Sequence, residues 1–234
     1  MRYKLVIKKL HELADPEKVI FKQHKYNIVT PNSLGIYHKD LKLLAKEIGY
    51  HPELALELIN SDIYEARLLG SKLLKPKNVT IEMATNWITF FNTWEICDSF
   101  CMGLFSKTSF AKDLIFKWSK NTKEFEKRAA FAILSSYCMA DKKAGNDVFL
   151  SFLPVIIDAS DDDRIYVKKA VNWALRSIGK RNQDLNREAI KTAQNILNIG
   201  SKPGIWIAKD AIKELTGEKV NILDYPREIY RNHI

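Results

Sequence analysis

The chain has 234 residues, of which 46% are hydrophobic and 28% are charged, so it can bury a substantial core and is too apolar for intrinsic disorder. Its 37 Lys and Arg against 28 Asp and Glu give a net charge of +9, which favours nucleic acid as partner and, second, an anionic membrane surface. Three cysteines, Cys97, Cys101 and Cys138, cannot all pair, and no apolar run approaches the roughly 18 residues of a membrane span. We therefore expect a cytoplasmic protein that does not span a membrane, and because nucleic acid ranks first we predict no membrane partner.

Amphipathic spacing with proline and glycine signals predicts helices along the first quarter of the chain. They should cover residues 4–13, 16–25, 40–48 and 52–59. Gly49 is expected to end the third helix, and Pro31, Asn32 and Gly35 indicate a loop over residues 27–35. No alternating strand pattern bounded by hairpin turns is present anywhere, so the chain should be all-α.

Five later segments share one register, in which an aromatic residue is followed three places later by a usually basic position. They begin at Tyr64, Trp94, Phe125, Tyr166 and Trp206, at intervals of 30, 31, 41 and 40 residues. Such intervals are typical of helix pairs that stack into solenoids. Their partner helices are expected over residues 81–91, 110–119, 147–159 and 186–197.

We therefore predict a HEAT-like helical-repeat solenoid that forms a single domain over residues 1–234. Residues 1–33 should be an N-terminal helical cap, residues 34–217 the repeats, and residues 218–234 a C-terminal surface tail. If the five segments are equivalent helices, their basic positions lie at matching depth along one surface, as a phosphate backbone would require. These positions are Arg67, Arg128, Lys169 and Lys209. The alternative is that they are ordinary solvated helix charges.

The stretch 164–181, RIYVKKAVNWALRSIGKR, separates into two stripes at 3.6 residues per turn. The apolar stripe consists of Val167, Val171, Ala174 and Ile178. The second stripe consists of Lys169, Trp173, Arg176 and Lys180. A tryptophan that shares its face with three cations indicates a contact surface. The alternative is a tryptophan at the rim of the core, shielded by Lys and Arg methylenes.

The second of the five segments departs from the pattern, because it has Cys97 at the basic position and Asp98 beside it. Asp98 follows Trp94 by four residues, so the two share a helix face that is otherwise apolar. An unpaired buried carboxylate is costly, so Asp98 should face a groove or have a partner, for which Arg128 is the candidate. A structural salt bridge between adjacent repeats is the alternative.

The run Asp161, Asp162 and Asp163 directly precedes the predicted helix at 164–181, and we interpret it as N-cap and first-turn charge rather than as a metal site. No phosphate-cradling glycine loop, dinucleotide-binding fingerprint or zinc-binding helix motif occurs in the sequence. We therefore expect no cofactor and no metal.

Three motifs, TWEICDSF, EFEKRAAFAIL and YVKKAVNWALRSIGKRN, occur in this order and resemble the DNA alkylation repair family of AlkD-like DNA glycosylases. The likeness runs from about residue 34 to residue 215. It implies a HEAT-like solenoid that removes N3- and N7-alkylated purines from double-stranded DNA, gripping the backbone around the lesion. A groove wide enough for duplex DNA suggests a monomer.

The resemblance also assigns roles to residues already singled out by face and register. It implies that Asp98 is the catalytic carboxylate, that Trp94 and Trp173 are active-site indoles, and that Arg128 acts beside them. The predicted DNA contacts, from the register, the stripe and the resemblance together, are Arg67, Arg128, Lys169, Arg176, Lys180 and Lys209. The family also includes branches without glycosylase activity that bind unusual DNA structures, so such a binder is the second reading, and a protein-binding HEAT scaffold is the third.

Overall fold

The computed structural model describes residues 3–231, and over that range the chain forms helices and connecting loops without a strand. The all-α prediction is therefore confirmed. The chain divides into two compact units, Met1–Thr108 and Ser109–Ile234, each described by itself below. The expectation of one continuous domain stays a prediction. No helix within residues 3–231 is long and apolar enough to cross a membrane.

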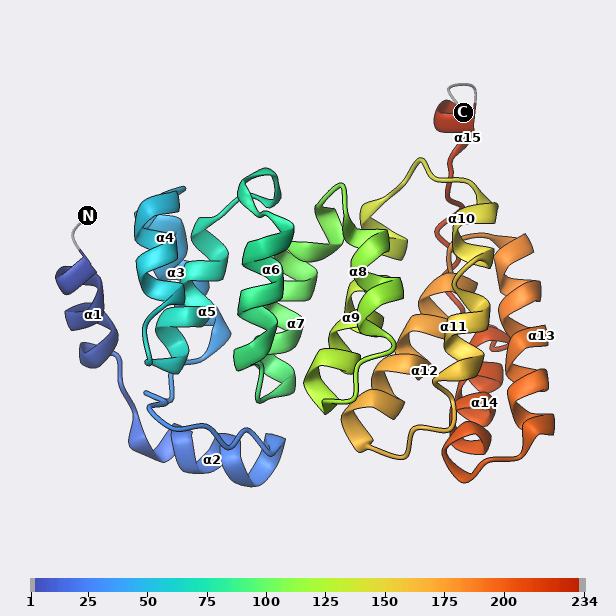
Figure 1. Ribbon diagram of the computed structural model, residues 1–234, viewed down its shortest axis with the longest axis horizontal. Coiled ribbons are helices and arrows are strands. Elements are labelled where there is room, and N and C mark those ends of the chain that lie inside the picture. The colour runs from blue at the N-terminus through green and yellow to red at the C-terminus, as the bar shows by residue number, and fades with distance from the viewer. Residues whose placement is uncertain (1–2, 232–234) are drawn as a thin grey trace. The chain divides into compact units, whose positions relative to one another are not determined.

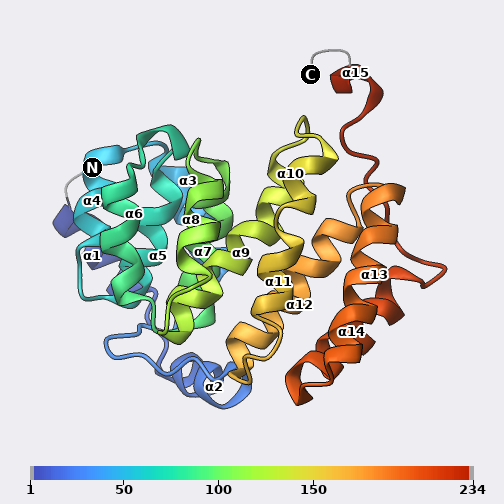
Figure 2. The ribbon, with the colours of Figure 1, turned by 45° about the vertical axis from the view of Figure 1, so that its right-hand side comes forward.

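The first unit contains seven α-helices within its described residues. They are α1 Tyr3–Glu12, α2 Pro16–Tyr26, α3 His38–Ile48, α4 Pro52–Ile59, α5 Tyr64–Leu73, α6 Ile81–Trp87 and α7 Trp94–Gly103. Helix α5 packs against α3, α4 and α7, so these helices form one layered bundle. Helix α2 is the exception, because it lies across one end of this bundle instead of alongside its members (Figures 1 and 2).

Local signals fixed several helix ends of this unit as predicted, although α6 ends at Trp87 and not at the predicted residue 91. Helix α4 has the predicted bounds, and Gly49 ends α3 with a φ of 77°. Asp15 caps α2 by accepting hydrogen bonds from the backbone N–H groups of Glu17 and Lys18. Gly35 has a φ of 74°, and a Cβ there would lie 2.2 Å from the Asp15 carbonyl oxygen. Only glycine therefore fits where the loop after α2 passes the start of that helix.

The second unit contains three helix pairs. Its helices are α8 Ala111–Trp118, α9 Glu124–Ala140, α10 Asn146–Leu150, α11 Leu153–Asp158, α12 Ile165–Gly179, α13 Gln183–Ile199, α14 Lys202–Leu215 and α15 Glu228–Arg231. Helix α12 packs against both α9 and α14, while α8, α11 and α13 each pack on the helix that follows them (Figures 1 and 2). The unit is thus a stack of helix pairs, as the repeat spacing predicted.

Two predicted elements of this unit differ in detail. The helix expected over 147–159 is split into α10 and α11, because Pro154 lies in the first turn of α11 and cannot continue a helix from before it. Tyr64 and Trp94 are the first residues of their helices, but α14 begins at Lys202, so Trp206 lies one turn further in. The fifth segment therefore does not keep the predicted register.

The acidic run before α12 is not a helix cap, so that interpretation is wrong. The N-cap of α12 is Arg164, which makes no side-chain capping bond, and the first turn of the helix contains no acid. Asp162 instead accepts from Lys127 of α9 at 3.0 Å and from Arg164 at 2.5 Å. Although burial opposes ionisation, these two cations lower the pKa of Asp162 to about 2. Asp162 thus ties the loop before α12 to α9.

The predicted surface tail is in part packed onto the helices. The backbone N–H groups of Leu223 and Tyr225 donate to the carbonyl oxygens of Lys180 and Arg181, and the Tyr225 side chain is buried. Arg181 is fully buried, lies 3.7 Å over the Phe149 ring, and donates to backbone carbonyls that follow α9. The tail therefore contributes to the core of its unit as far as residue 225. Its residues 232–234 lie outside the described part.

Candidate functional site

The start of α7 holds Trp94 in one orientation. Thr93 caps the helix by accepting from the backbone N–H of Ile96, which makes Trp94 its first residue. The Trp94 indole Nε1–H donates to the backbone carbonyl of Tyr26 at 2.9 Å, and the two rings meet edge to face at 6.4 Å. Helix α2 thus fixes the indole through its last residue. No sequence pattern pointed to Tyr26, because the contact joins residues 68 positions apart.

Asp98 lies one turn after Trp94 on α7 and is half-buried. Of its predicted apolar neighbours, Cys101 and Phe105 are fully buried, whereas Met102 is 41% exposed. The side chain of Asp98 is therefore reachable from solvent and is not sealed in the core. A carboxylate in this position can face a bound ligand.

A buried cluster of charged and polar groups lies directly beneath this helix end. Lys22 of α2 pairs with Glu95 at 2.8 Å and lies 4.0 Å from Glu65. The Tyr64 hydroxyl donates to Glu95 at 3.0 Å and shares a second bond with Thr93 at 2.7 Å. Burial and the nearby carboxylates raise the pKa of Tyr64, so its hydroxyl remains a donor. This cluster fixes α2 against the first turns of α5 and α7.

The second glutamate of the cluster anchors the loop that follows α2. Glu65 accepts from the backbone N–H groups of Leu34 at 2.7 Å and Gly35 at 3.0 Å, and from the Ser33 hydroxyl at 2.9 Å. Nearby, His38 lies 3.6 Å from Glu95. Burial, with Lys72 as a further cause, lowers the pKa of His38 to about 4, so the imidazole is neutral at pH 7.

Lys72 is a basic residue beside α7 that sequence reasoning missed. Its Nζ lies 3.4 Å from the Ser99 hydroxyl, on the residue after Asp98. Burial and the neighbouring charge of Lys42 lower the pKa of Lys72 to about 8. The one available signal was its position two turns after Tyr64 in the same helix.

Arg128, in the second unit, is a buried arginine. Its side chain is in the first turns of α9, and Nη1 donates to the Tyr166 carbonyl oxygen at 2.8 Å. Glu124 accepts from the Tyr166 backbone N–H at 3.1 Å, and the rings of Phe125 and Tyr166 lie 5.2 Å apart. Arg128 therefore helps to join α9 to the start of α12.

The two predicted stripes of α12 are confirmed. The apolar residues Val167, Val171, Ala174 and Ile178 are fully buried. Trp173 is half-buried, whereas Lys169 is exposed. Arg176 and Lys180 both form ion pairs with Glu214 of α14, and Arg176 Nε also lies 3.7 Å from Asp210. The cationic stripe is thus partly neutralised by the neighbouring helix.

The remaining predicted DNA contacts differ in their surroundings. Lys209 is exposed on α14, whereas Arg67 of α5 is half-buried. Arg67 donates to the Ser61 carbonyl at 2.6 Å and lies 4.5 Å over the Phe90 ring, and burial lowers its pKa. Of the four basic positions that the register predicted, Lys169 and Lys209 are therefore the most exposed.

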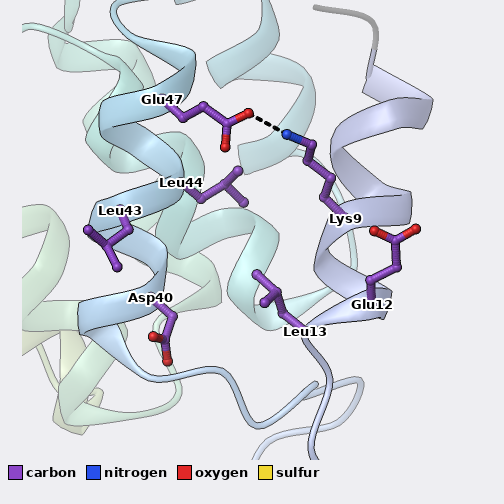
Figure 3. A pocket seen from close by; sticks show the side chains of 7 residues that line it. All are labelled: Lys9, Glu12, Leu13, Asp40, Leu43, Leu44 and Glu47. Carbon is purple, nitrogen blue, oxygen red and sulfur yellow. Dashed lines mark hydrogen bonds and ion pairs between the residues drawn. The ribbon is translucent and has the colours of Figure 1, made fainter.

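No predicted site residue is a cysteine, and none lines the hollow between α1 and α3. Cys97, Cys101 and Cys138 are buried. Within the described residues no group of three or more His, Cys, Asp or Glu side chains could hold a metal ion. A hollow of about 360 Å³ lies between α1 and α3, where Lys9 and Glu47 point toward one another (Figure 3), and no predicted site residue lines it.

The predicted catalytic residues are divided between the two units. Trp94 and Asp98 belong to the first unit, and Arg128 and Trp173 belong to the second. Trp94, Asp98 and Trp173 are half-buried, whereas Arg128 is buried. Their meeting at one site stays a prediction.

Comparison with known proteins points to one family. A sequence model described as DNA alkylation repair enzyme matches residues 6–215. Lin0241, an uncharacterized protein of Listeria innocua serovar 6a, is 25% identical over 202 residues, covering 82% of this chain and 86% of that protein. A solved structure from a new family of proteins related to the HEAT-like repeat DNA glycosylases with affinity for branched DNA structures matches with a TM-score of 0.70, at 20% identity and with 83% of each chain covered. This likeness confirms the predicted HEAT-like repeat fold.

Proposed function

This chain belongs to the DNA alkylation repair enzyme family, and from that premise we propose that it is a DNA glycosylase, which hydrolyses the N-glycosidic bond of N3- or N7-alkylated purines in double-stranded DNA. The observation that carries the proposal is the start of α7. A half-buried carboxylate, Asp98, lies there one turn from an indole, Trp94, that is fixed by a hydrogen bond to Tyr26. A fixed carboxylate beside a fixed aromatic face suits the stabilisation of a developing cation.

The chemistry needs no acid from the protein. An alkylated purine of this kind is already cationic, so it leaves without being protonated. As the bond to the base breaks, positive charge develops at C1′ of the deoxyribose, as in glycoside hydrolysis generally. In our proposal Asp98 stabilises this charge and orients the attacking water. Preorganised electrostatic help of this kind contributes about 10²- to 10³-fold in rate.

The indoles and the buried arginine have supporting roles in the proposal. Trp94 and Trp173 present their electron-rich faces to the sugar, where cation–π attraction contributes roughly 1–2 kcal/mol. Arg128 orients Asp98. Its guanidinium is buried and is held in place by the hydrogen bond that it donates to the Tyr166 carbonyl. The exposed Lys169 and Lys209 take the phosphate backbone. No step requires a metal or a cofactor.

The test is release of N7-methylguanine from a duplex incubated with excess protein. Wild type should release the base, and Asp98→Asn should be slower by about 10²- to 10³-fold. Asp184→Asn is a matched control, because Asp184 is an exposed carboxylate of α13 that pairs with the exposed Arg187. No release by wild type would refute the glycosylase, and equal release by Asp98→Asn would remove Asp98 from the mechanism.

A double-mutant cycle tests whether Asp98 and Arg128 act together. If Arg128 orients Asp98, Arg128→Lys should slow base release in wild type and have little further effect in Asp98→Asn. The same cycle applies to Trp94→Phe with Trp173→Phe if both indoles face one sugar. Additive losses in both cycles would place these residues at separate sites.

A second candidate, a DNA-structure binder without catalysis, is favoured by one observation. The solved structure with the similar fold belongs to a family described as having affinity for branched DNA structures. Such a protein would bind branched DNA strongly, with a steep dependence on salt, and release no base. Lys169→Ala should then reduce the slope of log affinity against log salt by about one. Base release by wild type would decide against this candidate.

A further inference from the structure

A second hollow, of about 350 Å³, lies in the second unit beside the end of α12. Three lysines line it, together with one carboxylate: Lys180, Lys213, Lys219 and Glu214. Lys180 follows the last turn of α12, Lys213 and Glu214 are in the last turn of α14, and Lys219 is in the loop after it. The excess of positive charge in so small a space favours an anion as occupant.

The carboxylate of Glu214 forms ion pairs with two neighbouring cations. One oxygen pairs with Arg176 Nη1 and the other with Lys180 Nζ, so each oxygen takes one cation. Burial opposes ionisation of Glu214, but these two hydrogen bonds outweigh it and lower the pKa of Glu214. Arg and Lys bind a phosphate in a similar way, with different cations bound to different anionic oxygens.

We propose that this hollow binds a phosphate of the DNA backbone and that Glu214 is a built-in competitor, which holds Arg176 and Lys180 until the phosphate displaces it. The proposal rests on the proposed function, because that function makes DNA the ligand. Lys213 and Lys219 supply the charge that favours the phosphate over the carboxylate.

The contacts of Glu214 are of a kind that can exchange. The side chains of Arg176, Lys180 and Glu214 are 24%, 34% and 33% exposed, so water can replace either partner while the contact opens. Asp210 is a poorer competitor, because it lies 3.7 Å from Arg176 and already accepts from Asn172 at 2.7 Å. Glu214 therefore weakens binding wherever the backbone does not fill the hollow. This raises the discrimination between well-seated DNA and other polyanions.

The test is the affinity of undamaged duplex DNA, measured by fluorescence anisotropy over a range of salt. Glu214→Gln should bind about 3- to 10-fold more tightly than wild type, since it frees two cations without adding a contact. Glu188→Gln is the matched control, because it makes the same charge change on α13, where Glu188 pairs with the exposed Lys191. It should stay within about twofold of wild type, as expected for a screened distant charge. Equal affinities for the two variants would overturn the competitor role.

Removing the lysines tests the hollow itself. The double variant Lys213→Ala, Lys219→Ala should lower the salt slope by up to about two, whereas Lys191→Ala should leave it unchanged. An unchanged slope in the double variant would overturn the phosphate site. Calorimetric titration with inorganic phosphate separates the two sources of the ligand. Submillimolar binding of free phosphate, lost in the double variant while DNA binding persists, would assign the hollow to a small anion and contradict our proposal.

Failure here is distinguishable from failure of the proposed function. The binding experiments use undamaged DNA and do not depend on base release. If wild type releases N7-methylguanine while Glu214→Gln and Glu188→Gln bind alike, only the inference about Glu214 fails. If wild type binds no DNA at low salt, the proposed function fails with it.

Discussion

Each of the two units contains a lysine paired with a glutamate, and the two pairs differ in their burial. Lys22 in the first unit is 3% exposed and pairs with Glu95, whose side chain is 9% exposed. Lys180 in the second unit is 34% exposed and pairs with Glu214, which is 33% exposed. The same pair of charged groups is thus sealed from water in one unit and open to water in the other.

This difference in burial decides what each pair can do. A buried charge that loses its partner costs several kcal/mol, so the pair around Lys22 holds α2 against the helix ends of α5 and α7 permanently. A half-exposed charge is restored by water when its partner leaves, so the pair around Lys180 can be exchanged for another anion. In the first unit the buried pair holds the helix whose last residue, Tyr26, accepts a hydrogen bond from Trp94. In our proposal, the exposed pair of the second unit gives way to a phosphate.

The largest effect should come from Lys22→Met, which leaves Glu65 and Glu95 buried without their cation. We expect it to lower the free energy of unfolding by about 3–5 kcal/mol, measured by urea denaturation. Lys25→Met is the control on the same helix, where the lysine is exposed and only lies 5.5 Å over the Phe21 ring. A loss below about 1 kcal/mol for Lys22→Met would show that the buried pair does not hold α2.

Asp162 provides a case between these two extremes. Its side chain is 7% exposed, but its partners Lys127 and Arg164 are 16% and 32% exposed. After discounting for solvent screening, Asp162→Asn should cost about 1–2 kcal/mol at pH 7. Asp163→Asn, which changes an exposed neighbour, should cost about 0.5 kcal/mol or less.

The pH dependence of this contribution has a defined sign. The pKa of Asp162 is about 2 in the folded chain and 3.8 as its ordinary value, so the unfolded chain binds the proton more readily. The contribution of Asp162 to wild-type stability should therefore be fully present above about pH 4 and be lost as the pH drops toward 2. The Asn variant should lack this loss. Parallel pH profiles for the two proteins would contradict the pairing.

His38 should have a smaller effect at mildly acidic pH. Its pKa of about 4 lies below the ordinary 6.5, because burial disfavours the imidazolium. The unfolded chain takes up the proton first, so stability falls as the pH drops from about 6.5 toward 4. Because the side chain is 36% exposed, we expect His38→Gln to remove only about 1 kcal/mol of this loss, measured by urea denaturation at pH 5 and 7. His24→Gln, an exposed imidazole on α2, is the control.

The sequence predicted features that depend on local contacts, and it did not predict those that depend on distant contacts. The bounds of α4, the end of α3 at Gly49 and the two stripes of α12 depend on residues within a few positions of each other. Patterns at that range are specified by proline, glycine and the helical period. These features are therefore predictable from the order of the residues alone.

The contacts that define the candidate site depend on residues far apart in the chain. The bond from Trp94 to Tyr26 spans 68 positions, and the pairing of Arg176 with Glu214 spans 38. No period or motif encodes which carboxylate or carbonyl a distant helix will present. The same limit explains the error at Asp162. The residue fits a local capping pattern, but in the folded chain it pairs with Lys127 and Arg164.

The smallest effect on stability should come from Lys180→Met, the same substitution as at Lys22. Because Lys180 and Glu214 are both about one-third exposed, we expect the free energy of unfolding to change by about 0.5 kcal/mol or less. The backbone carbonyl of Lys180, which accepts from Leu223, is kept by the substitution. Affinity for duplex DNA should fall nonetheless, with the salt slope lower by about one, because one phosphate contact is lost. A stability loss of about 2 kcal/mol or more at Lys180 would mean that this exposed pair also holds the fold, and the contrast between the two units would not stand.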